Sequence, residues 1–387
     1  DDVMLMQNFE EMGYEMQAGR LRQCVDYWLS YIGPSQLFKV TARQAQESGK
    51  HMYAKMQVCC SHEIASVPYV PVPGILYQKY KRATELGVEG IMQCWYFGNY
   101  PSLMSKVAGE LAFEQTYDDE EGFLKRIAAI YWGYEKAEQV VKVWKEFQAG
   151  YIQYPMNIMF SYYGPMQDGV VWKLSLNPKN YSLPRTWQTS DPADGDRIGE
   201  CMLNGHNIRE VLTLLEELCR HWEKGMELLS EIRRDNADEE EQFILAEAIQ
   251  VLFASGRNII KFYQLREELG LQKADPVKLL QQMRRLVLQE IENSEKMIPL
   301  CRKDGRLGYH SEGEGYKFFE EKIRDRIEDL RNLLKTEFTE VEKRIAQKKI
   351  PLGYYAAEED NDSVKRYHMS GKGLENAPWE VIDKEQN

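Results

Sequence analysis

The sequence lacks several features that would place the protein in a membrane or on nucleic acid. No uninterrupted apolar run reaches the roughly 18 residues that a membrane-spanning helix needs, and no secretory signal peptide opens the chain. The net charge is -12 over 387 residues, which argues against a phosphate backbone as the main partner. We therefore expect neither a membrane nor a nucleic acid among the partners.

Cysteine chemistry is also sparse. Seven cysteines are scattered along the chain, and none forms a CxxC pair. Their odd number and wide spacing favour buried free thiols in a reducing compartment, with a metal site or a disulfide framework as the lesser alternative. We expect no metal, no cofactor and a cytoplasmic location. The chain begins at Asp1 without an initiator Met, and we expect that an N-terminal part of a larger protein precedes it.

The amino-acid composition of the chain is that of a globular protein. Apolar residues make up 43% and charged residues 28% of the chain, and the length suggests two to three domains. Residues 1–115 alternate strand-like and helix-like stretches, which is the pattern of parallel βα units. Strands are predicted at 3–9, 53–63 and 88–97, and helices at 21–31, 35–48, 76–86 and 102–114.

Three strands are too few for a closed (β/α)8 barrel, which needs eight. The first segment is therefore either a small open sheet or the last strands of a (β/α)8 TIM barrel. Residues 116–350 have helical periodicity and predict an all-α bundle, interrupted by an irregular aromatic segment at 151–200. Residues 351–387 are polar and predict an extended tail. The bundle helices are predicted at 118–133, 134–150, 207–234, 239–269, 276–302 and 316–349.

The first candidate site lies at the end of the predicted strand at 53–63. Alternate side chains of a strand share a face, which places Gln57 and Glu63 on one face that becomes more polar toward its carboxyl end. Barrel enzymes place their chemistry at that end, so Glu63 is a candidate nucleophile, general base or sugar ligand. The alternative is a Glu that caps a helix or pairs with an Arg. His62 and Tyr69 are candidate substrate contacts beside it.

Glu10 and Asn8 occupy the analogous place after the first predicted strand. Glu10 is a candidate second catalytic carboxylate, and Asn8 is a candidate substrate contact. Glu11 and Glu15 follow closely, so the catalytic acid can be Glu10, Glu11 or Glu15. A solvated loop acid is the alternative.

An aromatic cluster follows the third predicted strand. Trp95 offers a flat apolar surface on which a sugar ring can stack, with Tyr96 and Tyr100 beside it. Gln93 and Asn99 are placed to hydrogen-bond sugar hydroxyl groups. The alternative is that Trp95 belongs to the core at the junction with the helical domain.

Residues 306–316 form a Gly-rich loop that carries His310 between two predicted helices. Helix connections in bundles are usually short, so one interpretation is that this loop completes the pocket of the α/β segment, with His310 contacting the substrate. The other is a purely structural connection. The Asp-rich stretch at 191–196 lacks the spacing of a calcium loop.

Three stretches, at 55–71, 87–102 and 306–316, together resemble bacterial glycoside hydrolases in which a TIM barrel precedes a helical C-terminal domain, hexosaminidase-like proteins in particular. The resemblance implies that the three strands correspond to about the sixth, seventh and eighth of a barrel. It implies a nucleophile at Glu63 in a retaining enzyme, whose acid/base would lie on a strand that this chain does not contain. In a hexosaminidase-like mechanism the substrate's acetamido group attacks instead, and Glu63 and Trp95 only bind sugar.

We therefore expect the C-terminal portion of a glycoside hydrolase that cleaves a glycosidic bond in a glycan, with an N-acetylhexosaminidase-type activity as one form. The expected partners are the glycan and either an N-terminal barrel segment or a partner chain. The alternatives are a non-catalytic carbohydrate-binding or scaffold protein and a helical interaction module with a small α/β cap.

Overall fold

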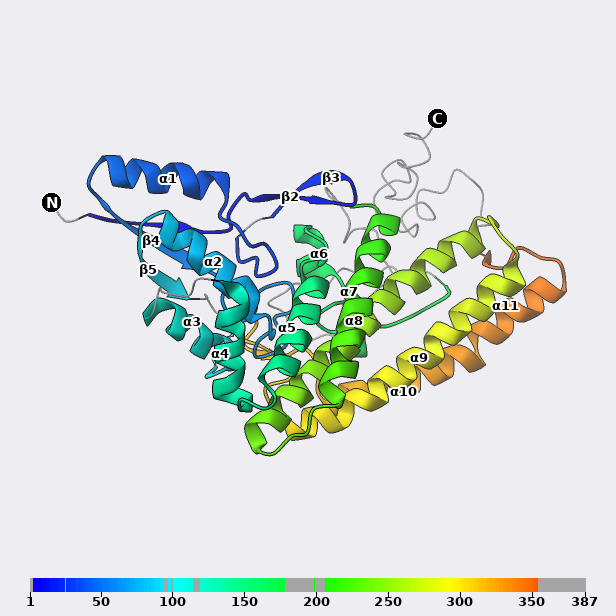
Figure 1. The fold of residues 1–387 in the computed structure, drawn as a ribbon. Coiled ribbons are helices and arrows are strands. Elements are labelled where there is room, and N and C mark those ends of the chain that lie inside the picture. The colour runs from blue at the N-terminus through cyan, green and yellow to red at the C-terminus, as the bar shows by residue number, and fades with distance from the viewer. Residues whose placement is uncertain are drawn as a thin grey trace. The chain divides into compact units, whose positions relative to one another are not determined.

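A computed structural model of the protein describes residues 3–24, 26–93, 97–98, 100–113, 119–177, 198 and 206–353. It is a mixed α/β structure in which most elements are helices (Figure 1). Contacts divide the chain into two compact units. The first comprises residues 1–158 and 214–250, and the second comprises residues 159–213 and 251–387. The domain boundaries that the sequence predicts, after residues 115 and 350, differ from this division by contacts. They stay a prediction.

The first unit is built on a parallel sheet of three strands in the order β1-β4-β5. The strands are β1 (Met4–Asn8), β4 (His51–Met56) and β5 (Val88–Gln93). Helix α1 (Gln36–Glu47) connects the first two strands, α2 (Pro73–Glu85) connects the last two, and α3 (Leu103–Phe113) follows. The Ser35 side chain caps α1, and Pro73 starts α2. The predicted alternation of strand and helix is confirmed.

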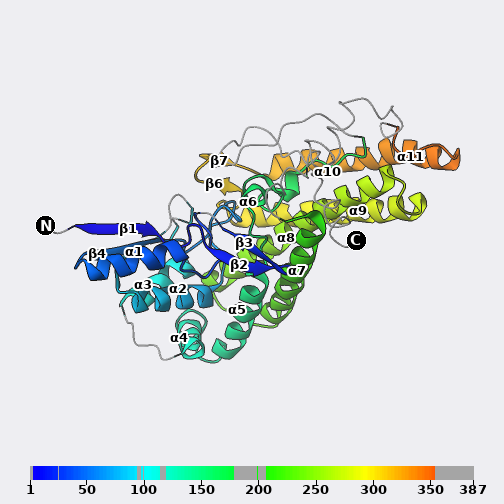
Figure 2. The ribbon, with the colours of Figure 1, turned by 90° about the horizontal axis from the view of Figure 1, so that it is seen from above.

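The two faces of this sheet differ in their cover. Met52, Ala54 and Met56 alternate along β4 and are all buried, so they share one covered face. Helices α1, α2 and α3 lie together on one side of the sheet (Figure 2). The opposite face includes Met4 and Met6 of β1, which are 65% and 55% exposed. Parallel sheets are normally covered on both faces. Within the described residues, this second face therefore carries exposed methionines beside polar side chains such as Lys55.

Strand β4 ends at Met56, so the predicted strand over 53–63 was too long. Residues 57–72 form an irregular segment that is nevertheless buried throughout. Pro68 and Pro71 have no amide hydrogen to give to a strand ladder. The prediction that Gln57 and Glu63 share one strand face was therefore wrong.

The predicted helix at 21–31 was also wrong, because residues 21–23 belong to a β-hairpin and residues 24 and 26–31 are irregular. Strand β2 (Tyr14–Gln17) pairs antiparallel with β3 (Arg20–Gln23). The two residues between them, Ala18 and Gly19, both have positive φ, at 51° and 74°. Such a two-residue turn matches the twist of the strands that it joins.

Four further helices contribute to the first unit: α4 (Glu120–Trp132), α5 (Ala137–Tyr151), α7 (Ile208–Ser230) and α8 (Ala237–Gly270). The last two also contribute residues to the second unit. Among the described helices, α8 is the one whose length and composition would suit a membrane span, and 72% of its most apolar window is buried inside the protein. This burial is typical of a core helix.

The second unit is mostly helical. It contains α6 (Ile158–Tyr163), the 3-10 turn η1 (Gly169–Val171), α9 (Pro276–Lys303), α10 (Glu320–Lys335) and α11 (Glu337–Ala346). A short hairpin of β6 (Tyr309–His310) and β7 (Gly315–Tyr316) precedes α10. The single helix predicted over 316–349 is thus two helices, which meet at Thr336, where φ is -104° and ψ is -81°.

Candidate active site

The carboxyl ends of β1 and β4 bring a group of polar side chains together. Asn8, the last residue of β1, pairs in register with Lys55 of β4. The Asn8 amide donates to Asp26 Oδ2 at 2.7 Å and makes a longer contact of 3.5 Å with Glu11 Oε2. Lys55 Nζ donates to the Tyr27 hydroxyl at 2.5 Å. These five side chains are all half-buried, so they combine a defined geometry with access to solvent.

Asp26 is the least satisfied member of this polar cluster of Asn8, Glu11, Asp26, Tyr27 and Lys55. Its Oδ1 atom is buried and has no hydrogen-bond partner in the part of the chain that the structure describes. Burial raises the pKa of Asp26, and the negative charge of Glu11 raises it further, while Lys55 and the Asn8 amide act in the opposite direction. The pKa of Asp26 is therefore higher than that of an ordinary aspartate.

Glu10 lies deeper and is fully engaged. Its Oε1 accepts a hydrogen bond from Lys79 Nζ of α2 at 2.7 Å and from the Gln57 backbone amide at 3.1 Å. Lys79 also donates to the Trp28 carbonyl at 3.0 Å, and the ion-paired side chains are 0% and 2% exposed. Burial raises the pKa of Glu10, and Lys79 is the main opposing influence. This is a buried ion pair rather than an accessible acid.

Glu63 is buried as well, at 0% exposure. Its carboxylate accepts from the Leu29 amide at 2.6 Å, from the Ser30 amide at 3.1 Å and from the Ser61 hydroxyl at 2.5 Å. Burial raises the pKa of Glu63, and these hydrogen bonds lower it. The geometry fixes the backbone at residues 29–30, just after Asp26, and catalysis by Glu63 stays a prediction.

The other predicted contacts are distributed differently. The His62 ring is buried and packs edge-on against Tyr27 at 5.7 Å and against Phe97 at 4.6 Å between ring centroids. His62 therefore adjoins the polar cluster through Tyr27. The Gln57 side chain is buried, and the Gln57 backbone amide donates a hydrogen bond to Glu10.

The remaining predicted residues of the first unit include some inside and some outside the described part of the chain. Tyr69 is buried in the irregular segment, and Tyr100 is half-buried. Gln93 donates to the Tyr80 hydroxyl of α2 at 3.2 Å, so it points to the face that the helices cover. Trp95, Tyr96 and Asn99 lie outside the described residues. The roles assigned to all of them stay predictions.

His310 belongs to the second unit. Its ring is buried, and Nδ1 accepts a hydrogen bond from the Gly313 amide at 3.0 Å. Burial lowers the pKa of His310 to about 3, so the ring is neutral at physiological pH. Its predicted contact with substrate stays a prediction.

No set of His, Cys, Asp or Glu side chains suited to a metal ion occurs within the described ranges. The Asp-rich stretch at 191–196 lies outside them. The side chains of the polar cluster carry carboxyl, amide, ammonium and phenol groups.

Sequence reasoning missed Asp26, Lys55 and Lys79. Asp26 was hidden by the wrong helix prediction. Lys55 had a visible signal, because it is a charged residue two positions after Tyr53 and on the same face of the strand. Lys79 interrupts the apolar stripe of α2, and a Lys in such a stripe is almost never fully buried without a partner.

No protein-family model matches the chain, and no curated protein matches its sequence. The fold is similar to that of a GH138 enzyme that targets pectin rhamnogalacturonan II. The TM-score is 0.52 at 9% sequence identity, and the match covers 89% of this chain and 42% of the enzyme. The chain therefore spans less than half the length of the GH138 enzyme and shares a fold with that part of it.

Proposed function

We propose that this chain is the C-terminal portion of a glycoside hydrolase that cleaves a glycosidic bond in a glycan. The observation that carries the proposal is the pair of carboxyl groups on Asp26 and Glu11, which contact one amide, that of Asn8, at the carboxyl end of a parallel sheet. Enzymes built on parallel βα units gather their reacting groups at this end. The fold shared with the GH138 enzyme, a glycoside hydrolase, supports the same class.

The cluster offers the two groups that this chemistry requires. Most glycosidases use two carboxyl groups, one of which is a general acid with a raised pKa. Asp26 fits the acid, because burial and Glu11 both favour its protonated form. Glu11 is then the second carboxylate, and the Asn8 amide and the Lys55 ammonium orient the pair and bind sugar hydroxyls.

In this proposal Glu63 is a positioning residue and not the nucleophile that its position in the sequence predicted. Its oxygens are occupied by two backbone amides and one hydroxyl, so it positions the segment that carries Asp26. The sequence prediction of a nucleophile at Glu63 remains a rival that the same assay tests.

The proposal includes a barrel that is completed by an N-terminal segment or a partner chain. Two observations support it. The second face of the sheet presents the exposed Met4 and Met6, and β1 and β5 are edge strands in the three-stranded order. Exposed edges and apolar faces of parallel sheets are normally covered. Additional strands packed beside β1 and β5 would do both.

The test is hydrolysis by the full-length protein. The probes are aryl N-acetylhexosaminides, from the sequence resemblance, and aryl galactosides and galacturonides, because the GH138 enzyme targets a pectin. Asp26→Asn is expected to reduce the turnover of the best probe by about 10²–10⁴-fold, the range for loss of a general acid or base. Glu47→Gln, which changes an exposed carboxylate at the end of α1, is the matched control and should retain full turnover.

Two results would decide against the proposal. Turnover that survives Asp26→Asn but is lost in a folded Glu63→Gln variant would restore Glu63 as the working carboxylate. Sugar binding without any turnover would favour the alternative of a non-catalytic carbohydrate-binding protein.

A further inference from the structure

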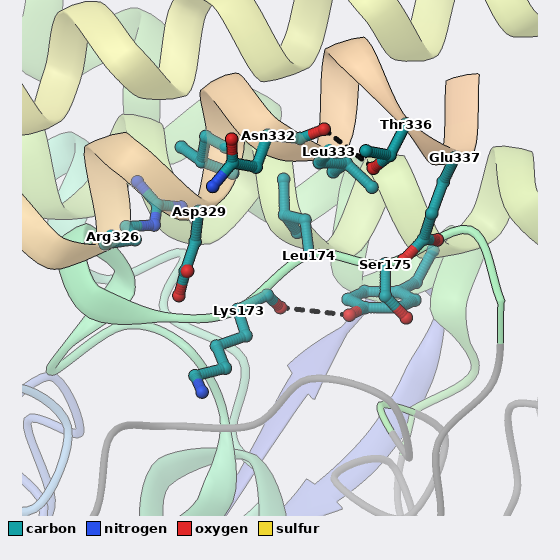
Figure 3. A pocket seen from close by; sticks show the side chains of 11 residues that line it. Lys173, Leu174, Ser175, Arg326, Asp329, Asn332, Leu333, Thr336 and Glu337 are labelled. Atoms are coloured by element: carbon teal, nitrogen blue, oxygen red, sulfur yellow. Dashed lines mark hydrogen bonds between the residues drawn. The ribbon is translucent and has the colours of Figure 1, made fainter. Parts of the chain in front are cut away.

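The second unit contains a pocket that the proposed active site does not include. Its volume is roughly 220 Å³. Its walls come from α10, from the start of α11, from residues 173–175 and from Tyr263 of α8 (Figure 3). All of these residues belong to the second unit, so the pocket is described entirely within one compact part of the chain.

The segment along one wall is tied to the helices at both ends. Glu337 accepts hydrogen bonds from the Leu176 amide at 2.8 Å and the Asn177 amide at 2.9 Å. Before them, the Tyr263 hydroxyl donates to the Lys173 carbonyl at 3.0 Å, a bond that Figure 3 also shows. The wall is thus held in place without a ligand, which lowers the entropic cost of binding one.

Arg326 is the buried cation of the pocket, and it is already paired. Arg326 is 2% exposed, and its Nη2 donates to Glu290 Oε2 at 2.8 Å. Its other donors meet the Trp172 carbonyl at 2.8 Å and the Ser294 hydroxyl at 2.7 Å. Because the guanidinium is buried and already paired with the Glu290 carboxylate, it does not make the pocket an anion site.

Three polar side chains of the pocket remain uncommitted: Lys173, Asp329 and Asn332. In the described part of the chain, no hydrogen bond or ion pair of these side chains is present, although all three line the pocket. In Figure 3, Asp329 and Asn332 project from α10, and Asp329 and Lys173 extend to the same side of the pocket. One cation, one anion and one neutral amide give a cluster with no net charge.

We infer that this pocket binds a single neutral sugar unit. A carboxylate, an amide and an ammonium group that line one pocket can hydrogen-bond neighbouring hydroxyls of one ring. The volume lies below the range of about 300–1,000 Å³ that is usual for drug-sized ligands, which fits one ring. The carboxylates of Asp329 and Glu337 in the lining disfavour phosphates and uronates. The inference does not rest on the proposed hydrolysis.

The probes are the methyl glycosides of galactose, glucose and mannose, offered separately to the full-length protein. Saturation-transfer NMR is expected to show contact with the ring protons of at least one of them. For that glycoside, Asp329→Ala and Asn332→Ala should each weaken the affinity about tenfold, because each removes a hydrogen-bonding group from the pocket. Glu328→Gln changes the neighbouring exposed acid of α10, which does not line the pocket, and should leave the affinity unchanged.

Several outcomes would overturn the inference. They are no transfer from any of the three glycosides, an affinity that Asp329→Ala and Asn332→Ala leave unchanged, or a preference for methyl galacturonoside over methyl galactoside. The Asp26→Asn variant separates this site from the proposed active site. It should bind the methyl glycoside as the wild type does, whether or not the protein hydrolyses any aryl glycoside.

Discussion

The first unit contains two sets of carboxylates that differ in how far their oxygens are engaged. Glu10 and Glu63 are buried and are held by an ammonium group, a hydroxyl and backbone amides. Asp26 and Glu11 are half-buried and both contact the Asn8 amide. Asp26 keeps a buried oxygen that has no partner among the described residues.

This difference suggests that the buried carboxylates, Glu10 and Glu63, hold in place the chain segment that carries the half-buried Asp26. Glu63 holds the amides of Leu29 and Ser30, and Lys79 joins the Trp28 carbonyl to Glu10. These bonds fix three successive residues shortly after Asp26. Reacting groups work best when neighbouring hydrogen bonds hold them in place, so the buried carboxylates position a segment that carries an unsatisfied one.

Breaking the buried ion pair should have the largest effect on stability. Lys79→Met leaves the Glu10 carboxylate buried without its cation, which typically costs about 3–5 kcal/mol. Urea denaturation followed by tryptophan fluorescence measures the loss. Lys81→Met, an exposed lysine on the same helix, is the control and should cost about 0.5 kcal/mol or less. The double variant Glu10→Gln/Lys79→Met should recover part of the loss, and a single variant as stable as the control would contradict the supporting role.

Asp168 extends the comparison to the second unit. It is 6% exposed. Burial raises its pKa to about 6 despite the charges of Lys317 and Lys322. The folded state therefore binds the proton more tightly than the unfolded state, whose pKa is about 3.9. Stability should fall as the pH rises from about 4 to about 6, by a total on the order of 3 kcal/mol.

The measurement is the free energy of unfolding across this pH range for the wild type and for Asp168→Asn. The Asn side chain does not titrate, so the difference between the two proteins should change with pH by the stated amount. Parallel curves from pH 4 to pH 7 would show that Asp168 does not carry a raised pKa.

Glu63→Gln should have an intermediate effect. The substitution replaces one acceptor oxygen with an NH₂ group that faces the donors of Leu29, Ser30 or Ser61. A buried donor that loses its partner costs about 1–3 kcal/mol. Thermal and urea denaturation measure this loss, with Glu47→Gln again as the control. A folded Glu63→Gln protein with unchanged stability would mean that the carboxylate is not needed to hold the segment.

The fold was predictable where local signals agree with each other. The Ser35 cap, Pro73 at the first turn of α2 and the apolar strands around it all point to parallel βα units, and these form. The errors arose where a short turn decides the structure. Ala18 and Gly19 both adopt positive φ, which an Ala does rarely, so the hairpin looked like the approach to a helix.

The candidate site was only partly predictable for a related reason. Asn8 could be found because it ends a strand, whereas Asp26 lies in a segment whose structure depends on Glu63 and Lys79. The bond between Glu10 and Lys79 joins residues 69 positions apart, and local periodicity carries no information about such a pair. Burial of a carboxylate, unlike its position at a strand end, depends on these distant partners.

The smallest effect on stability is expected for a substitution of Asp26, one of the two half-buried carboxylates. Asp26→Asn keeps the shape of the side chain and an oxygen to accept from Asn8, and it removes the repulsion from Glu11 that raises the pKa of Asp26. The free energy of unfolding should therefore change by about 0.5 kcal/mol or less, measured beside Glu63→Gln under the same conditions. A loss as large as that of Glu63→Gln would make Asp26 another structural carboxylate. A neutral change in stability together with a loss of turnover would separate the group that reacts from the groups that hold it in place.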